Sequence, residues 1–406
     1  MKDKIQLPRI KKVFFSILLS LFFISFFPVM GSAEPVFTIK PIATVSGQLD
    51  SNFYKTENNE EEVYTYLLQP GIQLGAATAK SKLDFIYTID AYFYSSPAED
   101  EDYVGYYTVL DASNKTTDRL TLGLKNFSYK TRRVDWYDDF TDTTERRKHT
   151  VNRLTPWLYY DFVNRFSVGL RYRWQDVDFD DSNSSDSVEH RGVFDLIYNP
   201  SRTTTLDLDY QHWKLNYGQG APDYDYTSNQ VGLIFQKRYK YFSFDAGGGY
   251  HKRHFEDPGL EDEDIIPYKV AIGAQNPPSF GIGRRIYERD SLGIKSHIYF
   301  DAERNFNDLG SFRTEDLFTL SLGHLFLEKI KGGLSGYYKI EDYENISRKD
   351  DTYGISGSIR YFFNDRWNLL FITGKEDRDS NVSGFSYENV YLTLNLEFSY
   401  PIGRKR

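Results

Sequence analysis

Two histidines in this sequence stand close to an aspartate, as acid–base partners do. Asp209 precedes His212 by three residues, and His297 precedes Asp301 by four. A hydrolase uses such a pair to activate a nucleophile, with a third group that orients the histidine. Neither pair has an orienting group nearby, and no G-x-S-x-G motif occurs. We therefore predict that these residues are polar side chains without a catalytic role.

Two other short motifs could suggest a ligand. His251 and His254 are three residues apart, so a straight strand would send them to opposite faces, where they cannot share a metal. Gly281 and Gly283 belong to GIGRRI, which lacks the third glycine and the following helix of a dinucleotide site. We expect no metal and no cofactor.

One acidic run begins like a calcium-binding loop. Asp176, Asp178 and Asp180 have the right spacing, but Asp181 stands at the turn glycine and Ser187 at the closing glutamate. A solvated acidic loop is the favoured interpretation. Weak calcium bridging to lipopolysaccharide is the alternative.

The elements that must position these residues are strands, because apolar side chains recur with a period of two. In residues 166–176, FSVGLRYRWQD, one face is apolar and the other carries Arg171 and Arg173. Four other stretches alternate in the same way: residues 82–93, 292–301, 354–362 and 391–400. In residues 205–217 the apolar side switches between Tyr210 and Trp213, which a bulge or a strand rising above a membrane would explain.

The connections between these stretches alternate in length. Short turns, for example at residues 78–81, 163–165 and 364–366, separate longer charged loops such as DFDDSNSSDS, ENISRKDD and DRDSNVS. Nine long loops and eight short turns, with the unclear stretch from 276 to 291 counted among the turns, predict about 18 strands, with 16 to 20 acceptable. No boundary divides the chain into further domains.

Composition narrows the function classes. The 406 residues include no cysteine, which excludes a disulfide framework or a thiolate metal site, and 17% of them are aromatic, which favours strands. The net charge of -9 argues against binding nucleic acid. The mean hydropathy of -0.56 is low for a protein in a membrane.

The N-terminus has the features of an export signal. Basic residues precede the apolar run at residues 13–30, and Gly31, Ser32 and Ala33 supply a small-residue cleavage site. We predict a signal peptide at 1–33 and a barrel domain at 34–406. A membrane anchor is the alternative, because the run approaches spanning length.

We predict an all-β fold: a single transmembrane, up-and-down, antiparallel β-barrel with its apolar face toward lipid. A sandwich of this many hairpins would leave open edges, whereas closure removes them. Polar residues then face a wet interior, which explains the hydropathy. Aromatic residues at strand ends, Trp213 among them, suit interfacial girdles. The candidate lumen residues are Asp84, Asp90, Arg171, Arg173, Asp207, Asp209, Lys295, Asp301, Arg360 and Glu397.

Tyrosines also fall on the predicted polar face. Tyr92, Tyr94 and Tyr299 alternate with apolar residues. Aromatic rings stack on the apolar faces of sugars while hydroxyl groups form hydrogen bonds. Ordinary filling of the barrel, or a place in its aromatic girdle, is the favoured interpretation of these tyrosines, and sugar binding is the alternative.

The chain resembles the outer-membrane family called putative β-barrel porin 2. The resemblance rests on FTIKPIATVSGQLDSNFY, YLLQPGIQLGAA, DYENISRKDDTYGISGSIRYFF and EDRDSNVSGFSYENVYLTLNLEFSYPI, and it extends over the chain after residue 33. It implies a Gram-negative outer-membrane channel associated with exopolysaccharide export or exosortase genes, without catalytic residues. The tail PIGRKR after Tyr400 departs from the usual aromatic end of such barrels.

Three functions remain open at this point. The first is a channel or porin linked to passage or assembly of a surface polysaccharide. The second is a non-conducting barrel that anchors an export complex through its acidic loops, and the third is an outer-membrane hydrolase. The expected partners are outer-membrane lipid and lipopolysaccharide, the barrel-assembly machinery, and polysaccharide or export components.

Overall fold

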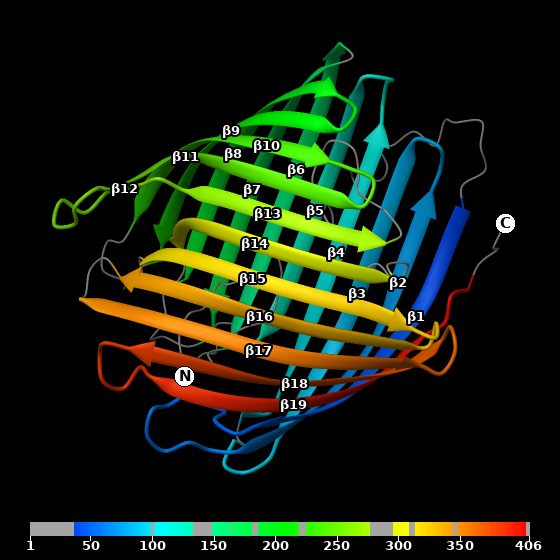
Figure 1. Cartoon of the computed structure of the whole chain (residues 1–406), viewed down its shortest axis with the longest axis vertical. Coiled ribbons are helices and arrows are strands. Elements are labelled where there is room, and N and C mark those ends of the chain that lie inside the picture. The colour runs from blue at the N-terminus through cyan, green and yellow to red at the C-terminus, as the bar shows by residue number, and fades with distance from the viewer. Residues whose placement is uncertain are drawn as a thin grey trace, which may run out of the picture.

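The computed structural model describes residues 36–98, 101–132, 148–163, 165–180, 186–218, 225–276, 295–307, 313–343 and 347–402. Over these residues, nineteen strands form a single antiparallel sheet (Figure 1). The strands are β1 (Val36–Asp50), β2 (Val63–Ala77), β3 (Ser81–Tyr94), β4 (Tyr103–Lys115), β5 (Leu120–Thr131), β6 (His149–Val163), β7 (Phe166–Phe179), β8 (Ser187–Ser201), β9 (Thr204–Tyr217), β10 (Tyr226–Arg238), β11 (Phe242–Phe255), β12 (Glu263–Ile265), β13 (Tyr268–Asn276), β14 (Ser296–Asn307), β15 (Arg313–Phe326), β16 (Ile330–Tyr343), β17 (Arg348–Phe362), β18 (Trp367–Ser380) and β19 (Tyr387–Ser399).

The sheet closes on itself. Apart from β12 and β13, each strand pairs with its sequence neighbours, and β1 pairs with both β2 and β19, so that Thr44 lies opposite Glu397. Both β12 and β13 pair with β11, so together they occupy one strand position around the barrel. The strand is interrupted between them at Pro267, which has no backbone N–H to donate. The described strands therefore fill 18 barrel positions, as predicted. Closure leaves no strand edge unpaired.

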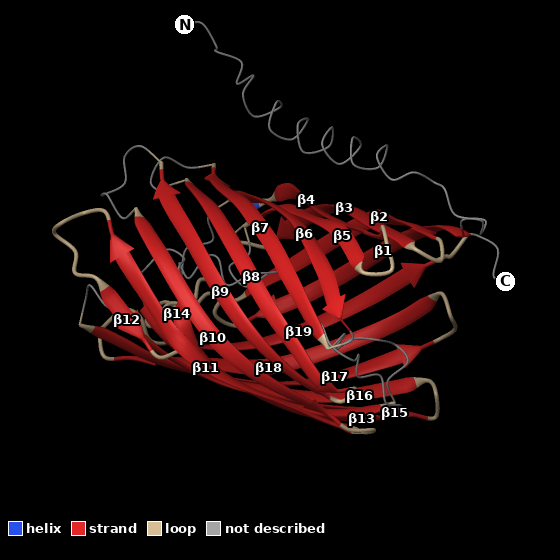
Figure 2. Cartoon of the chain, turned by 90° about the horizontal axis from the view of Figure 1, so that it is seen from above, coloured by secondary structure: helices blue, strands red, loops and turns tan. Residues whose placement is uncertain are grey.

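Among the described connections, short turns lie at one end of the barrel and longer loops at the other. Residues 78–80 and 363–366 make short connections, where the sequence predicted them. The loop at residues 51–62, between β1 and β2, belongs to the opposite end. The strands cross the barrel obliquely between the two ends (Figure 2).

Apolar side chains cover one face of the barrel strands. In β19, Leu392, Leu394 and Leu396 are exposed, and the residues between them are less accessible. The same alternation places Ile355 and Ile359 of β17 on the exposed face. Successive side chains along a strand of a closed sheet point alternately outward and inward. We therefore infer that the more shielded, polar face lines the interior.

Some predicted features lie outside the described residues. These are the signal peptide at 1–33, Gly281 and Gly283 in the unclear stretch, and Asp181 of the acidic run. Among the described residues, no helix has the length and hydropathy needed to cross a bilayer.

The switch of apolar residues in β9 is not caused by a bulge in its pairing with β10. The pairing of β9 with β10 runs from Thr204 to Leu215 without a shift in register. Trp213 and Leu215 are each 1% exposed and pack against Tyr226 and Phe255. They therefore lie on the interior face, near the long loops, and the assignment of Trp213 to an interfacial girdle is wrong.

Candidate functional site

The candidate site is the interior face of the barrel, and nine of the ten predicted lumen residues lie in its strands. Lys295 is the exception, because it precedes β14 by one residue and is exposed. Asp90, Asp207 and Asp209 are buried. The remaining six are half-buried: Asp84, Arg171, Arg173, Asp301, Arg360 and Glu397.

A network of arginines and carboxylates spans β7 to β9. Nη2 of Arg171 lies 2.9 Å from Oδ1 of Asp195 and 3.4 Å from Oδ2 of Asp209. Three neighbouring strands thus hold two carboxylates around one guanidinium. Alternation alone singled out Arg171 and Asp209, whereas Asp195 became apparent only from the pairing of β8.

A second group on the same strands is built around Glu189. Both of its oxygens accept hydrogen bonds from Arg173, at 2.7 and 2.9 Å, and both accept from Arg191, at 3.1 and 3.0 Å. The guanidinium of Arg191 also stacks 3.9 Å from the ring centroid of Trp213. Planar guanidinium groups suit this combination of bidentate pairing and stacking.

Three of the other predicted residues have partners: Asp90, Arg360 and Glu397. Asp90 accepts hydrogen bonds from Thr88 at 2.7 Å and Gln69 at 3.0 Å. Arg360 donates to Glu397 of β19 and to Asn368. The inferred interior face therefore carries both charge signs in close contact.

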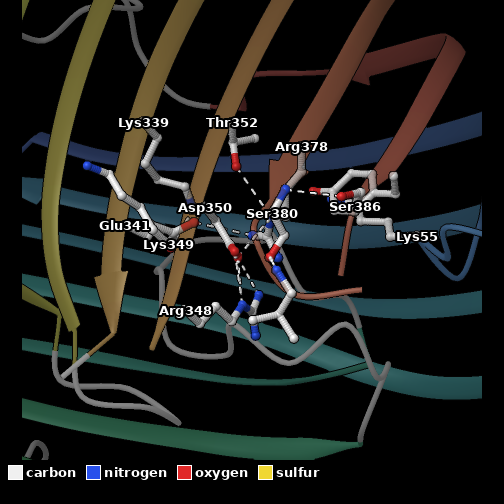
Figure 3. Close-up of polar contacts among 12 residues, drawn as sticks. Lys55, Lys339, Glu341, Arg348, Lys349, Asp350, Thr352, Arg378, Ser380 and Ser386 are labelled. Carbon is white, nitrogen blue, oxygen red and sulfur yellow. Dashed lines mark hydrogen bonds and ion pairs between the residues drawn. The ribbon is translucent and has the colours of Figure 1, made fainter. Parts of the chain in front are cut away.

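The most shielded ionic cluster lies on β15 to β18, near the long loops (Figure 3). Glu341 is 0% exposed. Its carboxylate lies 2.7 Å from Nε of Arg313, 3.1 Å from Nζ of Lys339 and 3.4 Å from Nη2 of Arg378. Three cations thus surround one buried anion.

Asp350 is the second buried anion of this cluster. Nε of Arg348 lies 3.0 Å from both of its oxygens, and Arg378 donates to the neighbouring Thr352 at 3.3 Å. The guanidinium of Arg348 lies 3.7 Å from the ring centroid of Phe385. Aromatic faces attract such cations most strongly where water is excluded.

Sequence reasoning missed this cluster because it assigned ENISRKDD and DRDSNVS to loops. In the structure, Arg348 begins β17 and Ser380 ends β18, so both charged runs are partly in strands. A usable signal was present. Arg348, Asp350 and Thr352 continue the period of two that follows them in β17.

The predicted sugar-binding tyrosines are packed against other rings. Tyr92 stacks on Tyr103 with ring centroids 4.7 Å apart, and Tyr94 contacts Phe53 at 5.3 Å. Each of these four rings is at most 6% exposed, and Tyr299 is 3% exposed. They fill space in the described structure, so the alternative of barrel filling fits their present packing.

His212 does not pair with Asp209 in the structure. Asp209 is buried on the interior face, whereas His212 lies on the other face and contacts Asn229 at 2.9 Å. His251 is buried and His254 is exposed, in keeping with opposite faces. In the loop after β11, the hydrogen bond from His254 lowers the pKa of Asp262 below its ordinary value.

The acidic run after β7 is only partly described. Asp180 forms an ion pair with Lys130 at 2.8 Å, and residues 181–185 lie outside the described part. Within the described residues, no three His, Asp or Glu side chains are arranged to hold a metal ion. A solvated acidic loop stays the prediction, with weak calcium bridging as the alternative.

Comparison with known proteins found one family that matches part of the chain. Residues 310–400 match the family described as putative β-barrel porin 2. The match includes β15 to β19 but not the opening segment at 37–54, so it covers less of the chain than the resemblance drawn from sequence. No curated protein matches the chain.

Several solved structures are similar in fold. OccAB4 of Acinetobacter baumannii has 11% identity and a TM-score of 0.48, covering 91% of this chain and 98% of its own. OccK5 (OpdH) of Pseudomonas aeruginosa has 8% identity and a TM-score of 0.48, with the same coverage. The outer membrane protein OpdK of Pseudomonas aeruginosa has 9% identity and a TM-score of 0.48, covering 90% and 99%.

Over the described residues the chain forms a closed β-barrel with an apolar outer face. Its C-terminal strands are similar to the putative β-barrel porin 2 family. Charged residues on the inferred interior face form ion pairs and hydrogen bonds with one another. Whether they line a conducting lumen stays a prediction.

Proposed function

We propose that this protein is an outer-membrane channel for polar solutes, linked to the passage or assembly of a surface polysaccharide. The observation that carries the proposal is the alternation along the strands. Paired charged residues lie on the interior face, and apolar residues lie between them on the outer face. Hydrocarbon on the outside requires a closed sheet, and a polar inside favours water and hydroxylated solutes.

The pairing of the interior charges supports a polar rather than a strongly ion-selective path. Arg171 is shared by Asp195 and Asp209, and Glu189 by Arg173 and Arg191. Opposite charges at these distances largely cancel each other's long-range field. The hydrogen-bonding groups that remain suit a sugar chain, and the family resemblance supplies the link to polysaccharide export.

A second candidate is a non-conducting barrel that binds or anchors an export complex through its long acidic loops. The dense packing at the loop end favours it, because Glu341, Asp350 and Ser228 are each 0% exposed. In this role the partners are export components, in addition to outer-membrane lipid, lipopolysaccharide and the barrel-assembly machinery. We propose no catalytic role for either candidate.

Planar-bilayer recordings of the purified full-length protein separate these candidates. A channel gives discrete current steps, and a soluble oligosaccharide of the exported type reduces the current in proportion to its concentration. Detergent carried through the same purification without protein is the control. Folded protein that gives no steps at any voltage, yet co-purifies with export components, would overturn the channel and support the anchor.

A further inference from the structure

The loop at residues 51–62, between β1 and β2, has a defined fold. The side chain of Asn52 is 0% exposed, accepts a hydrogen bond from N of Thr56 at 3.0 Å and donates to the Thr56 carbonyl at 2.8 Å. Lys55 has a positive φ of 53°. These contacts turn the chain tightly, so Phe53 and Lys55 are held in fixed positions.

One side of this loop packs against aromatic residues of the interior face. Phe53 is 1% exposed, lies in one cluster with Val63, Tyr92 and Tyr103, and meets the ring of Tyr94 edge-on. Tyr92 and Tyr94 alternate in β3 with the exposed Phe93, so both belong to the shielded face. The loop is therefore folded toward the interior on the β3 side.

The other side of the loop is fastened to β18. Nζ of Lys55 lies 2.7 Å from Oε1 of Glu376, and the two side chains are only 15% and 18% exposed. Tyr337 of β16 and Tyr387 of β19 donate hydrogen bonds to the same carboxylate. Figure 3 shows Lys55 beside Arg378 and Ser386, at the edge of the buried ionic cluster.

Backbone contacts add to this attachment. Asn389 of β19 accepts a hydrogen bond from N of Asn52 at 3.1 Å, and N of Gly384 donates to the carboxylate of Glu57. Around the barrel, β18, β19, β1, β2 and β3 are consecutive positions. The loop thus lies over the loop-end interior face of these strands and is held at both margins.

We propose that this loop is a constriction of the barrel interior, and that the Lys55–Glu376 ion pair is the latch that holds it in place. The inference rests on the proposed channel function and names the residues that set the width of the channel. With the latch intact, the loop covers the tyrosines of β3. When the ion pair is lost, the loop moves away from the interior face and the channel widens. The rings of the β3 tyrosines then become accessible to a sugar chain.

The latch is sensitive to loss of either partner. Removing one member of a shielded ion pair leaves the other charge without compensation in a place where water is scarce. Lys55→Met keeps most of the aliphatic stem and removes the charge, which leaves Glu376 with its two tyrosines. Glu376→Gln preserves the size of the side chain and removes the attraction.

Conductance is the first test. Lys55→Met and Glu376→Gln should each raise the single-channel conductance roughly two-fold, because current follows the open cross-section of an aqueous pore. Lys375→Met is the matched control. Lys375 directly precedes Glu376 in β18 and pairs with Glu388 at 2.8 Å in an exposed position. Unchanged conductance in both latch variants would overturn the proposal.

Limited proteolysis is a second test that does not require conduction. Trypsin cleaves after lysine, so cleavage after Lys55 should be slow in the folded wild-type protein and several-fold faster in Glu376→Gln. Glu388→Gln should behave like wild type. Equal rates of cleavage after Lys55 in all three proteins would overturn the latch.

The two tests also separate failure of the latch from failure of the channel. A wild-type barrel without current, but with cleavage that depends on Glu376, would retain the latch and reject the channel. A conducting barrel with neither effect would retain the channel and reject the latch. Heat-dependent gel mobility establishes that each variant is folded before either measurement.

Discussion

Individual charged residues of the interior are stabilised by partners from neighbouring strands. Glu341 is 0% exposed and Arg313 is 1% exposed, with 2.7 Å between Oε1 and Nε. A shielded charge is costly unless it is paired and hydrogen-bonded. These residues therefore depend on one another, in contrast to ion pairs at the surface, which contribute little.

Substitution of Glu341 tests this dependence. Glu341→Gln leaves Arg313 and Arg378 without their shared anion, and we expect a loss of about 3 kcal/mol in the free energy of unfolding. Glu303→Gln is the control, because the Lys269–Glu303 pair is about half exposed on both sides and should contribute below about 1 kcal/mol. Urea unfolding in lipid vesicles, followed by tryptophan fluorescence, measures both. Equal stability of the two variants would contradict the prediction.

At the scale of elements, close approach between strands restricts some positions to glycine. A Cβ atom added at Gly249 of β11 would collide with the carbonyl oxygen of Val231 and lie 2.9 Å from the Cα of Gly232, both in β10. Backbone atoms of a paired strand cannot move aside without breaking the ladder. At Gly47 of β1, a Cβ atom would meet no heavy atom within 4 Å.

Alanine substitutions compare these two positions. Gly249→Ala should destabilise the barrel by about 1 to 3 kcal/mol through overpacking, while Gly47→Ala should leave its stability unchanged. The fraction of protein with the mobility of the folded form in unheated gels, measured over a urea series, reports the difference. A Gly249→Ala barrel as stable as wild type would show that β10 and β11 can separate at this point.

For the whole molecule, closure of the sheet places the two faces of each strand in different environments, one outside the barrel and one inside it. Leu394 is 44% exposed on the outer face, and Asn395 follows it on the shielded face. Lipid and water then select opposite residue types at neighbouring positions. This explains how a barrel with an apolar outer face can have a mean hydropathy of only -0.56.

An arginine scan of β19 checks the two surroundings. Leu394→Arg should cost about 2 to 4 kcal/mol of stability in a bilayer, since a charge would face hydrocarbon near mid-depth. Asn395→Arg should cost far less, because its side chain points to the polar interior. The measurement is folding efficiency into lipid vesicles. A larger defect for Asn395→Arg would mean that the faces have been assigned the wrong way round.

Local pattern in the sequence determined the fold to a large extent. A period of two depends only on neighbouring residues, so it identified strands, their apolar faces and the turns between them before any contact was known. It also identified Arg171, Asp209 and Glu397 as polar residues among apolar ones. It failed where apolar residues pack inside, as at Trp213, and where charged residues extend a strand, as at Arg348.

Tertiary structure alone decided which residues meet. Lys55 and Glu376 are 321 positions apart, and no spacing in the sequence links them. They meet because β19 pairs with β1, which places the first long loop beside β18. Closure of the barrel is a long-range event, so the ion pairs of the interior and the attachment of the loop depend on contacts that no local pattern contains.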